Sequence, residues 1–409
     1  MDMITETEQS ASLTGQLHLI ASQTLEKKNE VKEMGLLGGK AGITLLFAYL
    51  SKAFPEKEYL QNTMDYLDEL SDALSNEELN YSMSSGVTGI AFVFQHLRNM
   101  DILDREEDLN LSELDEFIAA GAEIDFKTGN WDPLHGLTGL GIYFLERNRE
   151  TGEQKYLEKI VDYLAAMRTD HEDSRVWITP GYENYSEDNY NFGTAHGMPG
   201  ILSFLAQVYD RGILKNEIRE MISSALPYLL RHEFTDDVFC FPTALDVIPK
   251  KEEEKPFSRL GWCYGDLCMA LALVHCGKAL QNEEWKDKGL EIALKTTRRT
   301  LENSGCTDAP FCHGSVGLVH LYQRLFNLSK DPEFKKASEK WLDITLQTYY
   351  KPGEGAGGYF FRSYNEEEKV FVQTPQYSLL EGSAGIGLVH LSSVTGIQPD
   401  WDIIFLGNV

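Results

Sequence analysis

The sequence predicts an all-α protein, an α/α toroid in which seven inner helices alternate with seven outer helices. Three observations support this prediction. A Gly-x-x-Gly pattern recurs seven times along the 409 residues, an apolar stretch of helical length follows each copy, and amphipathic segments lie between the copies. The leading glycines are 47 to 68 residues apart, and repeats of this order indicate a closed or stacked array of supersecondary units.

The inner helices follow the seven glycine-led copies. They are apolar nearly all round, as is typical of helices buried on both sides. The fifth copy has Cys268 in place of the second glycine. If all seven helices run in the same direction, the residues before the leading glycines face the central cavity or its rim. These residues are Gly38, Ser85, His135, His196, Tyr264, His313 and Glu381.

The outer helices are predicted from apolar residues at helical spacing with charged residues on the opposite face. In residues 154–168, for example, Leu157, Ile160, Val161 and Leu164 form one stripe. Segments of the same kind cover 58–70, 215–230, 283–301 and 331–350.

Three of the spacings between leading glycines are longer than the others because they contain insertions, at residues 172–195, 233–262 and 352–378. They are rich in aromatic residues, Pro, Gly and charge, with short alternating runs, so we expect loops with some β structure over the cavity mouth. No low-complexity linker divides the chain, and we expect residues 1–409 to form a single domain.

Charge and composition exclude several classes of protein. With 37 Lys and Arg against 64 Asp and Glu, the net charge is −27, which repels a phosphate backbone and favours a neutral or cationic peptide as partner. No apolar run approaches the about 18 residues of a transmembrane helix. The polar N-terminus lacks the features of a secretory signal, and six cysteines are too few for a disulfide scaffold, so we expect a cytoplasmic protein.

A candidate metal site is indicated by Cys263 and by the adjacent pair Cys312 and His313. They immediately precede two consecutive inner helices, so closure of the fold would bring them to the same rim. Two thiolates and one imidazole suit zinc, and three protein ligands leave a fourth position open for catalysis. The remaining cysteines are expected to be small buried apolar residues; they are Cys240, Cys268, Cys276 and Cys306.

The motifs GWCYGD, CHGSVG and AHGMPG, together with the sevenfold repeat, resemble the lanthionine synthetase C-like family over essentially the whole chain. The resemblance implies an α/α toroid with one zinc ion at the cavity mouth, bound by Cys263, Cys312 and His313. It also implies a stand-alone lantibiotic cyclase. Such an enzyme adds peptide Cys thiols to dehydroalanine or dehydrobutyrine and forms lanthionine or methyllanthionine thioether rings.

The chemistry of this reaction agrees with the implied ligands. A free thiol has a pKa of about 8.5, so only a small part of it is thiolate near neutral pH, whereas zinc deprotonates a bound thiol. Two protein thiolates offset the charge of the ion, which leaves a third, substrate sulfur electron-rich enough to attack a β-carbon. Converging helix N-termini add positive potential where the enolate develops.

The resemblance points to His196 and Asp132 for proton transfer. In the simplest division, His196 transfers the proton and Asp132 orients or charges the imidazole, but these roles are open to reversal or sharing. The alternative for Asp132, which precedes Pro133, is that it only caps a helix. Arg259 is a candidate for stabilising the enolate oxygen or holding an Asp, and Tyr264 for donating a hydrogen bond. Packing of the cavity wall is the alternative for both.

Two other rim residues receive no catalytic role: His135 stays unassigned, and Glu381 is expected to cap its helix. The implied partners are a dehydrated precursor peptide with its leader, a separate dehydratase and an exporter, in a complex at the inner face of the cell membrane. The alternative is a thiol-binding homologue that uses the same ligands for glutathione without lantibiotic cyclisation. Other α/α-toroid enzymes, such as prenyltransferase or glycosidase relatives, are disfavoured by the Cys-Cys-His set.

Overall fold

The computed structural model describes residues 6–104, 110–181, 188–236, 238–247 and 258–409. Within these ranges the chain is mainly helical, and its strands form three two-stranded antiparallel sheets. No helix in the described part of the chain is long and apolar enough to cross a membrane.

The chain forms two compact units. Unit 1 consists of the residues up to Asp115 together with Thr307–His320 and Ser338–Trp401, and unit 2 consists of Glu116–Cys306, Leu321–Ala337 and Asp402–Val409. Four helices contribute residues to both units: α5 (Leu111–Thr128), α13 (Ser315–Ser329), α14 (Pro332–Ile344) and the 3-10 helix Asp400–Phe405. The expectation of a single domain stays a prediction.

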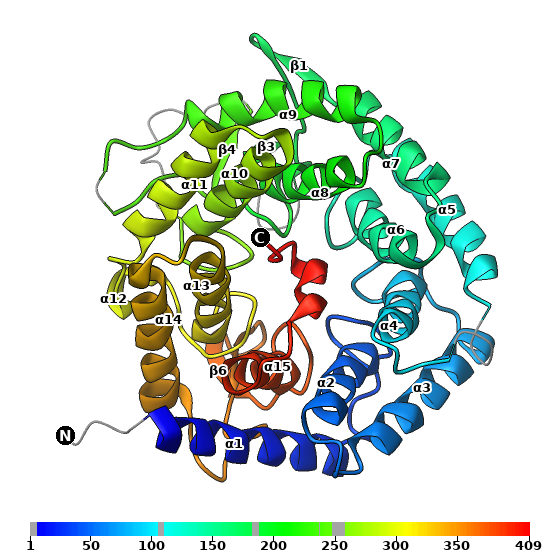
Figure 1. The fold of residues 1–409 in the computed structure, drawn as a ribbon, viewed down its shortest axis with the longest axis vertical. Coiled ribbons are helices and arrows are strands. Elements are labelled where there is room, and N and C mark those ends of the chain that lie inside the picture. Colours follow the sequence, from blue (N-terminus) through cyan, green and yellow to red (C-terminus); the bar gives the residue numbers. More distant parts are fainter. Residues whose placement is uncertain (1–5, 105–109, 182–187, 237, 248–257) are drawn as a thin grey trace. The chain divides into compact units, whose positions relative to one another are not determined.

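Unit 1 has a layer of glycine-led helices and a layer of amphipathic ones. Helix α2 (Lys40–Ala53) packs between α4 (Val87–Asn99) and α15 (Ser383–Val394), and these three helices are buried along nearly their whole length. The outer helices α1 (Glu6–Glu26) and α3 (Tyr59–Asn76) cover α15 and α2 (Figure 1). A π-helical turn, Thr345–Tyr349, follows α14.

Unit 2 repeats this arrangement around three inner helices that lie wholly within it. Helix α8 (Met198–Asp210) packs between α6 (Leu137–Thr151) and α10 (Asp266–Leu280). Each inner helix has its own cover, and these outer helices are α7 (Lys155–Ala166), α9 (Lys215–Leu230) and α11 (Glu283–Thr296) (Figure 1). A short helix, α12 (Leu301–Ser304), follows α11, so the predicted segment 283–301 is interrupted after Thr296.

All seven glycine-led segments are helices, as predicted, and the second glycine of the repeat has a definite steric reason. A Cβ atom at Gly200 would lie 2.2 Å from the carbonyl oxygen of Thr194, and one at Gly317 would lie 2.1 Å from that of Phe311. The loop six residues earlier therefore passes against the helix where only a glycine leaves room. In the fifth copy, the Cys268 thiol instead donates a hydrogen bond to the Trp262 carbonyl oxygen, with a sulfur–oxygen distance of 3.0 Å.

The three predicted insertions do contain short strands. Strands β1 (Thr169–His171) and β2 (Ser174–Val176) pair with each other beside α9, and β3 (Asn189–Asn191) pairs with β4 (Ala244–Asp246) from the second insertion. The third insertion forms a hairpin of β5 (Phe361–Asn365) and β6 (Val370–Thr374). Residues 182–187, 237 and 248–257 of these insertions lie outside the described residues, and the place of the insertions over a cavity mouth stays a prediction.

The C-terminal segment of unit 2 packs onto its inner helices. The Phe405 carbonyl oxygen accepts a hydrogen bond from Trp262 Nε1 at 2.7 Å, and the Leu406 carbonyl oxygen lies 3.0 Å from His275 Nε2. Asp402 forms two hydrogen bonds with Arg324 of α13, at 2.6 and 2.7 Å. The end of the chain is thus part of the core that supports the loop before α10.

Candidate metal centre

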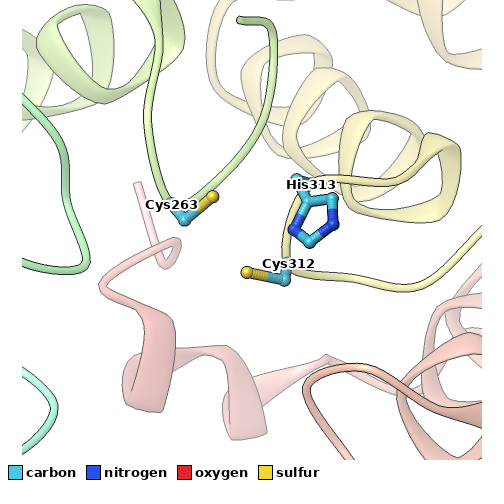
Figure 2. Close-up of side chains that lie close together, drawn as sticks. All are labelled: Cys263, Cys312 and His313. Carbon is cyan, nitrogen blue, oxygen red and sulfur yellow. The ribbon is translucent and has the colours of Figure 1, made fainter. Parts of the chain in front are cut away.

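Two loops bring three potential metal ligands together. Cys263 precedes α10, and Cys312 and His313 precede α13. Their ligand atoms, the two sulfurs and one imidazole nitrogen, all lie within 4.8 Å of one another (Figure 2). Both cysteines are buried and His313 is half-buried. The three side chains therefore lie together as expected, and their binding of a metal stays a prediction.

The loop that carries Cys263 is held at several points. The Cys263 carbonyl oxygen accepts a hydrogen bond from the amide of Ala195, at 3.3 Å. Trp262 is buried, with its indole N–H bonded to the Phe405 carbonyl and its ring in edge contact with the Phe405 ring, 4.8 Å between centroids. Gly265, with a φ of 131°, then turns the chain into α10. This conformation favours glycine because side chains clash there.

A buried ion pair fixes the chain on both sides of Cys263. The Asp266 carboxylate accepts hydrogen bonds from Arg299 at 3.0 Å, from the amide of Phe241 at 2.9 Å and from the Ser258 hydroxyl at 3.1 Å. Arg299 also donates to the Ser258 carbonyl oxygen at 2.7 Å. Asp266 and Arg299 are both fully buried. Segment 258–266 is therefore anchored at both ends, with Cys263 between the anchors.

The loop that carries the other two ligands is also hydrogen-bonded within unit 1. The amide of Cys312 donates to the Leu380 carbonyl oxygen at 3.1 Å, and the amide of Leu380 donates to the Leu37 carbonyl oxygen at 3.0 Å. The His313 ring lies 6.2 Å from the ring of Phe361, the first residue of β5. The loop before α13 thus touches the start of the hairpin and the segment that follows it.

The proton-transfer candidates His196 and Asp132 form a close pair in unit 2. His196 Nδ1 lies 2.7 Å from Asp132 Oδ2. The other carboxylate oxygen of Asp132 accepts hydrogen bonds from the amides of Leu134 and His135, both at 2.8 Å. One oxygen of Asp132 thus caps the turn before α6, but not the helix itself, whose N-cap is Gly136 without a side-chain hydrogen bond. The other oxygen faces the imidazole, and the division of proton-transfer roles stays a prediction.

The surroundings of His196 favour its protonated form. Burial by itself lowers the pKa of His196, but the hydrogen bond and charge of Asp132, with a smaller contribution from Cys263, outweigh burial and raise it. Nδ1 is the donor in this pair when the imidazole is charged. The arrangement is that of a histidine which gains a proton more readily than usual and whose orientation a carboxylate sets.

Two aromatic rings neighbour His196. His135, for which the sequence offered no role, stacks against His196 with 5.8 Å between ring centroids, and Tyr264 lies 6.2 Å away in a tilted arrangement. Burial lowers the pKa of His135, although Asp132 opposes the shift. The neighbouring imidazoles thus differ in their tendency to hold a proton. The rim position of His135 before its leading glycine was the only sequence signal for this contact.

Arg259 was one candidate for an arginine that holds an Asp, and no contact of its guanidinium with an Asp is found among the described residues. It is exposed, and its Cβ packs 3.0 Å from the position that a Cβ of Gly305 would occupy. One buried carboxylate near this loop is that of Asp266, and its cationic partner is Arg299, which no motif indicated. The role of Arg259 at the enolate oxygen stays a prediction. Glu381 is half-buried immediately before the leading glycine of α15.

The other cysteines behave as buried apolar residues, in agreement with the prediction. They are Cys240, Cys268, Cys276 and Cys306, all free and buried, and in the described part of the chain none of them joins a cluster of potential metal ligands. Burial raises the pKa of Cys240 and of Cys268 to about 12, so these thiols stay protonated at neutral pH.

Comparison with known proteins identifies the family. The model of the lanthionine synthetase C-like proteins matches residues 30–406. The chain belongs to the lanthionine synthetase C-like family. It is 26% identical over 338 residues to the nisin biosynthesis protein NisC of Lactococcus lactis subsp. lactis, covering 76% of this chain and 80% of that protein. It is also 23% identical over 313 residues to a glutathione S-transferase LANCL1 of Danio rerio, covering 72% and 70%.

The structural comparison establishes the fold of this lanthionine synthetase C-like chain. It matches the structure of nisin cyclase with a TM-score of 0.75 and 20% sequence identity, over 96% of this chain and 97% of that one. Because nisin cyclase is an α/α toroid, the predicted fold class is confirmed.

Proposed function

We propose that this lanthionine synthetase C-like protein is a zinc-dependent lanthipeptide cyclase. In the proposed reaction, a peptide Cys thiol adds to dehydroalanine or dehydrobutyrine of the same peptide and forms a lanthionine or methyllanthionine ring. The observation that carries the proposal is the cluster of Cys263, Cys312 and His313, with ligand atoms within 4.8 Å of one another. The relatedness to the nisin biosynthesis protein supports it.

The residues of the cluster fit a zinc ion. Sulfur and imidazole nitrogen are the donors that zinc prefers, and a set of three leaves room for one further ligand. Burial of the two cysteines lowers competition from water, and the anchored backbone around Cys263 limits its movement. A bound zinc ion would supply Lewis acidity that converts a substrate thiol into thiolate at neutral pH.

His196 and Asp132 account for the proton in this proposal. The thiol loses its proton, a carbon–sulfur bond forms at the β-carbon, and the π electron pair of the double bond moves to the α-carbon, which then takes up a proton. His196 Nε2 is suited to exchange this proton, because Nδ1 is paired with Asp132 Oδ2 at 2.7 Å. The raised pKa of His196 keeps its acid form available near neutral pH. Tyr264, with its ring centroid 6.2 Å from that of His196, helps to orient the imidazole in this proposal.

A second candidate function is binding or transfer of glutathione at the same cluster, without formation of peptide rings. The observation in its favour is the relative named glutathione S-transferase LANCL1. The two candidates differ in the thiol used: the cyclase uses a cysteine of the acceptor peptide, and the alternative uses a separate thiol molecule.

The first experiment is elemental analysis of zinc per chain. We expect about one zinc ion in the wild type and a strong loss in Cys263→Ala and Cys312→Ala. The matched control is Cys240→Ala, because Cys240 is equally buried but lies outside the cluster. A zinc-free wild type, or ligand variants that keep their zinc, would refute the ligand assignment.

A second assay separates the two candidate functions. A peptide with one dehydroalanine and one Cys is incubated with the protein in the presence of glutathione. A cyclase accelerates the loss of alkylatable thiol without a change in peptide mass, whereas a glutathione transferase accelerates the gain of one glutathione. Acceleration of neither reaction by the zinc-loaded protein would argue against the cyclase and against glutathione transfer.

The implied partners and location are also proposals. The precursor peptide with its leader follows from the relatedness to the nisin biosynthesis protein. A separate dehydratase, an exporter and a cytoplasmic place at the inner face of the cell membrane follow from the family resemblance. Co-purification of the three proteins with the membrane fraction, and its loss when the dehydratase is deleted, would test this group of proposals.

A further inference from the structure

We propose that the β5–β6 hairpin of unit 1 is a docking strand for the precursor peptide. The peptide would bind as an extended, apolar and cationic segment along the free edge of the hairpin, with side chains on its aromatic face. This inference rests on the proposed function, because it assigns a binding surface to the substrate of that reaction.

The hairpin carries an unusual share of the exposed apolar surface. In the described part of the chain, six large hydrophobic side chains are exposed, and three of them, Tyr364, Val370 and Phe371, belong to this hairpin. Tyr364 and Phe371 are 45% and 58% exposed. They are direct partners in the strand register, and their rings meet edge to face with 5.2 Å between centroids. Exposed apolar side chains gathered in this way mark interaction sites more often than isolated ones do.

The aromatic face is ordered by a cation. The guanidinium of Arg362 lies 4.0 Å from the centroid of the Phe371 ring, on the same face of the sheet as Tyr364. Contact with both neighbours holds the Phe371 ring in place before any partner binds. Rigid aromatic side chains lose little conformational entropy on binding, which makes them suitable anchors for a peptide.

The hairpin also offers backbone hydrogen bonds. It is a two-stranded sheet, and among the described residues the outer edge of β6 has no partner strand. The edge of β5 is less available, because the amide of Arg362 already donates to Asp308. An extended peptide can add to such an edge, with main-chain hydrogen bonds supplying affinity and side chains on the face supplying selectivity.

Both ends of the hairpin are attached to the loop that carries Cys312 and His313. At the first strand, the amide of Arg362 donates to Asp308 Oδ2 at 3.1 Å, and the Phe361 ring lies 6.2 Å from the His313 ring. After the second strand, the Leu380 carbonyl accepts from the amide of Cys312 at 3.1 Å. A peptide bound to the hairpin would therefore lie on an element that is hydrogen-bonded to the loop of Cys312 and His313.

The charge of the turn favours a peptide over a membrane surface. Glu366, Glu367 and Glu368 are consecutive at the turn, and the amides of Glu367 and Glu368 both donate to Asn365 Oδ1. Lys369 follows the three glutamates directly, so the turn keeps a net charge of −2, which repels an anionic lipid surface and attracts lysine or arginine. The occupant that fits both features carries apolar side chains for the face and basic side chains for the turn.

The test uses a phage-displayed library of random 12-residue peptides selected on the wild-type protein. Enriched peptides are made with a fluorescein label, and their affinity is measured by fluorescence anisotropy. The hairpin variant is Tyr364→Ser/Phe371→Ser. The matched control is Leu60→Ser/Phe117→Ser, which removes two side chains of similar exposure, 48% and 47%, from α3 and α5.

We expect peptides rich in aromatic, aliphatic and basic residues, at least about a tenfold rise of Kd in the hairpin variant, and unchanged Kd in the control. Absence of enriched peptides, or equal affinity for the wild type and the hairpin variant, overturns the proposal. The proposal is also overturned if the wild type sediments with phosphatidylglycerol vesicles and the hairpin variant loses this sedimentation but keeps its peptide affinity. Zinc content is measured in parallel. A hairpin variant that loses peptide affinity but keeps its full zinc content supports the docking strand. A wild type that binds peptides but contains no zinc contradicts the proposed cyclase and not the docking strand.

Discussion

Replacement of Arg299 by Met tests the buried ion pair that anchors the loop of Cys263. Arg299 and Asp266 are both fully buried, with 3.0 Å between Nη1 and Oδ2. Methionine retains much of the apolar stem of arginine but no charge and no donor. The variant therefore leaves the Asp266 carboxylate in the core with the Phe241 amide and the Ser258 hydroxyl as its donors.

The expected cost follows from the burial of both groups. Removing one partner of a buried ion pair typically costs about 3 to 5 kcal/mol of unfolding free energy. The hydrogen bonds that remain to Asp266, including one from the amide of Cys240, place the expected value near the lower end, at about 3 kcal/mol.

The cost should also depend on pH. Burial raises the pKa of Asp266 while Arg299 opposes this, so the pKa rises further in the variant. A carboxyl group whose pKa is raised in the folded state binds a proton on folding, and its stability contribution is lost as pH increases towards the folded-state pKa. The loss of unfolding free energy in Arg299→Met, relative to the wild type, should therefore be smaller near pH 5 than near pH 8.

Urea unfolding of wild type, Arg299→Met, Asp266→Asn and the double variant measures this as a thermodynamic cycle. The double variant should be more stable than the sum of the single changes predicts, because it contains neither an unpaired carboxylate nor an unpaired guanidinium. The control is Arg298→Met at the exposed neighbouring position, expected within about 0.5 kcal/mol of wild type. Equal stability of Arg298→Met and Arg299→Met, or additive effects in the cycle, would refute the reasoning.

Two further substitutions test the turn before α10 and the proton-transfer pair. Gly265→Ala places a side chain on a residue with a φ of 131° and brings its Cβ to within 2.0 Å of the Arg259 carbonyl oxygen. We expect urea unfolding to show a loss of at least about 2 kcal/mol of unfolding free energy, together with a loss of bound zinc. A variant as stable as the wild type would contradict this. Asp132→Asn removes the charge that raises the pKa of His196, so this pKa should fall in an NMR titration. A raised histidine pKa gives stability that is present below the unfolded-state value of 6.5 and is lost as pH rises through the folded-state value, so the variant should lose stability mainly at acid pH. A His196 pKa that stays unchanged or rises would contradict the assigned pairing.

The sequence alone determined the repeating helices and the residues at their starts. Each inner helix depends on neighbours within a few positions: an apolar stretch forms the helix, and a glycine admits the loop carbonyl six residues earlier, as at Gly200 and Gly317. The same repeat shows that Cys263, Cys312 and His313 directly precede two consecutive inner helices. These features are local, which is why periodicity and motif spacing were sufficient to predict them.

The tertiary structure decided which distant side chains meet. Arg299 pairs with the buried Asp266, and His135 stacks on His196. Sequence patterns did not predict these contacts, because they join segments 33 to 61 residues apart whose distance depends on helix packing. Strand β3 likewise found its partner β4 in a different insertion. The exposure of the hairpin face is also a tertiary property, since a short alternating run does not tell which of its sides the rest of the molecule will cover.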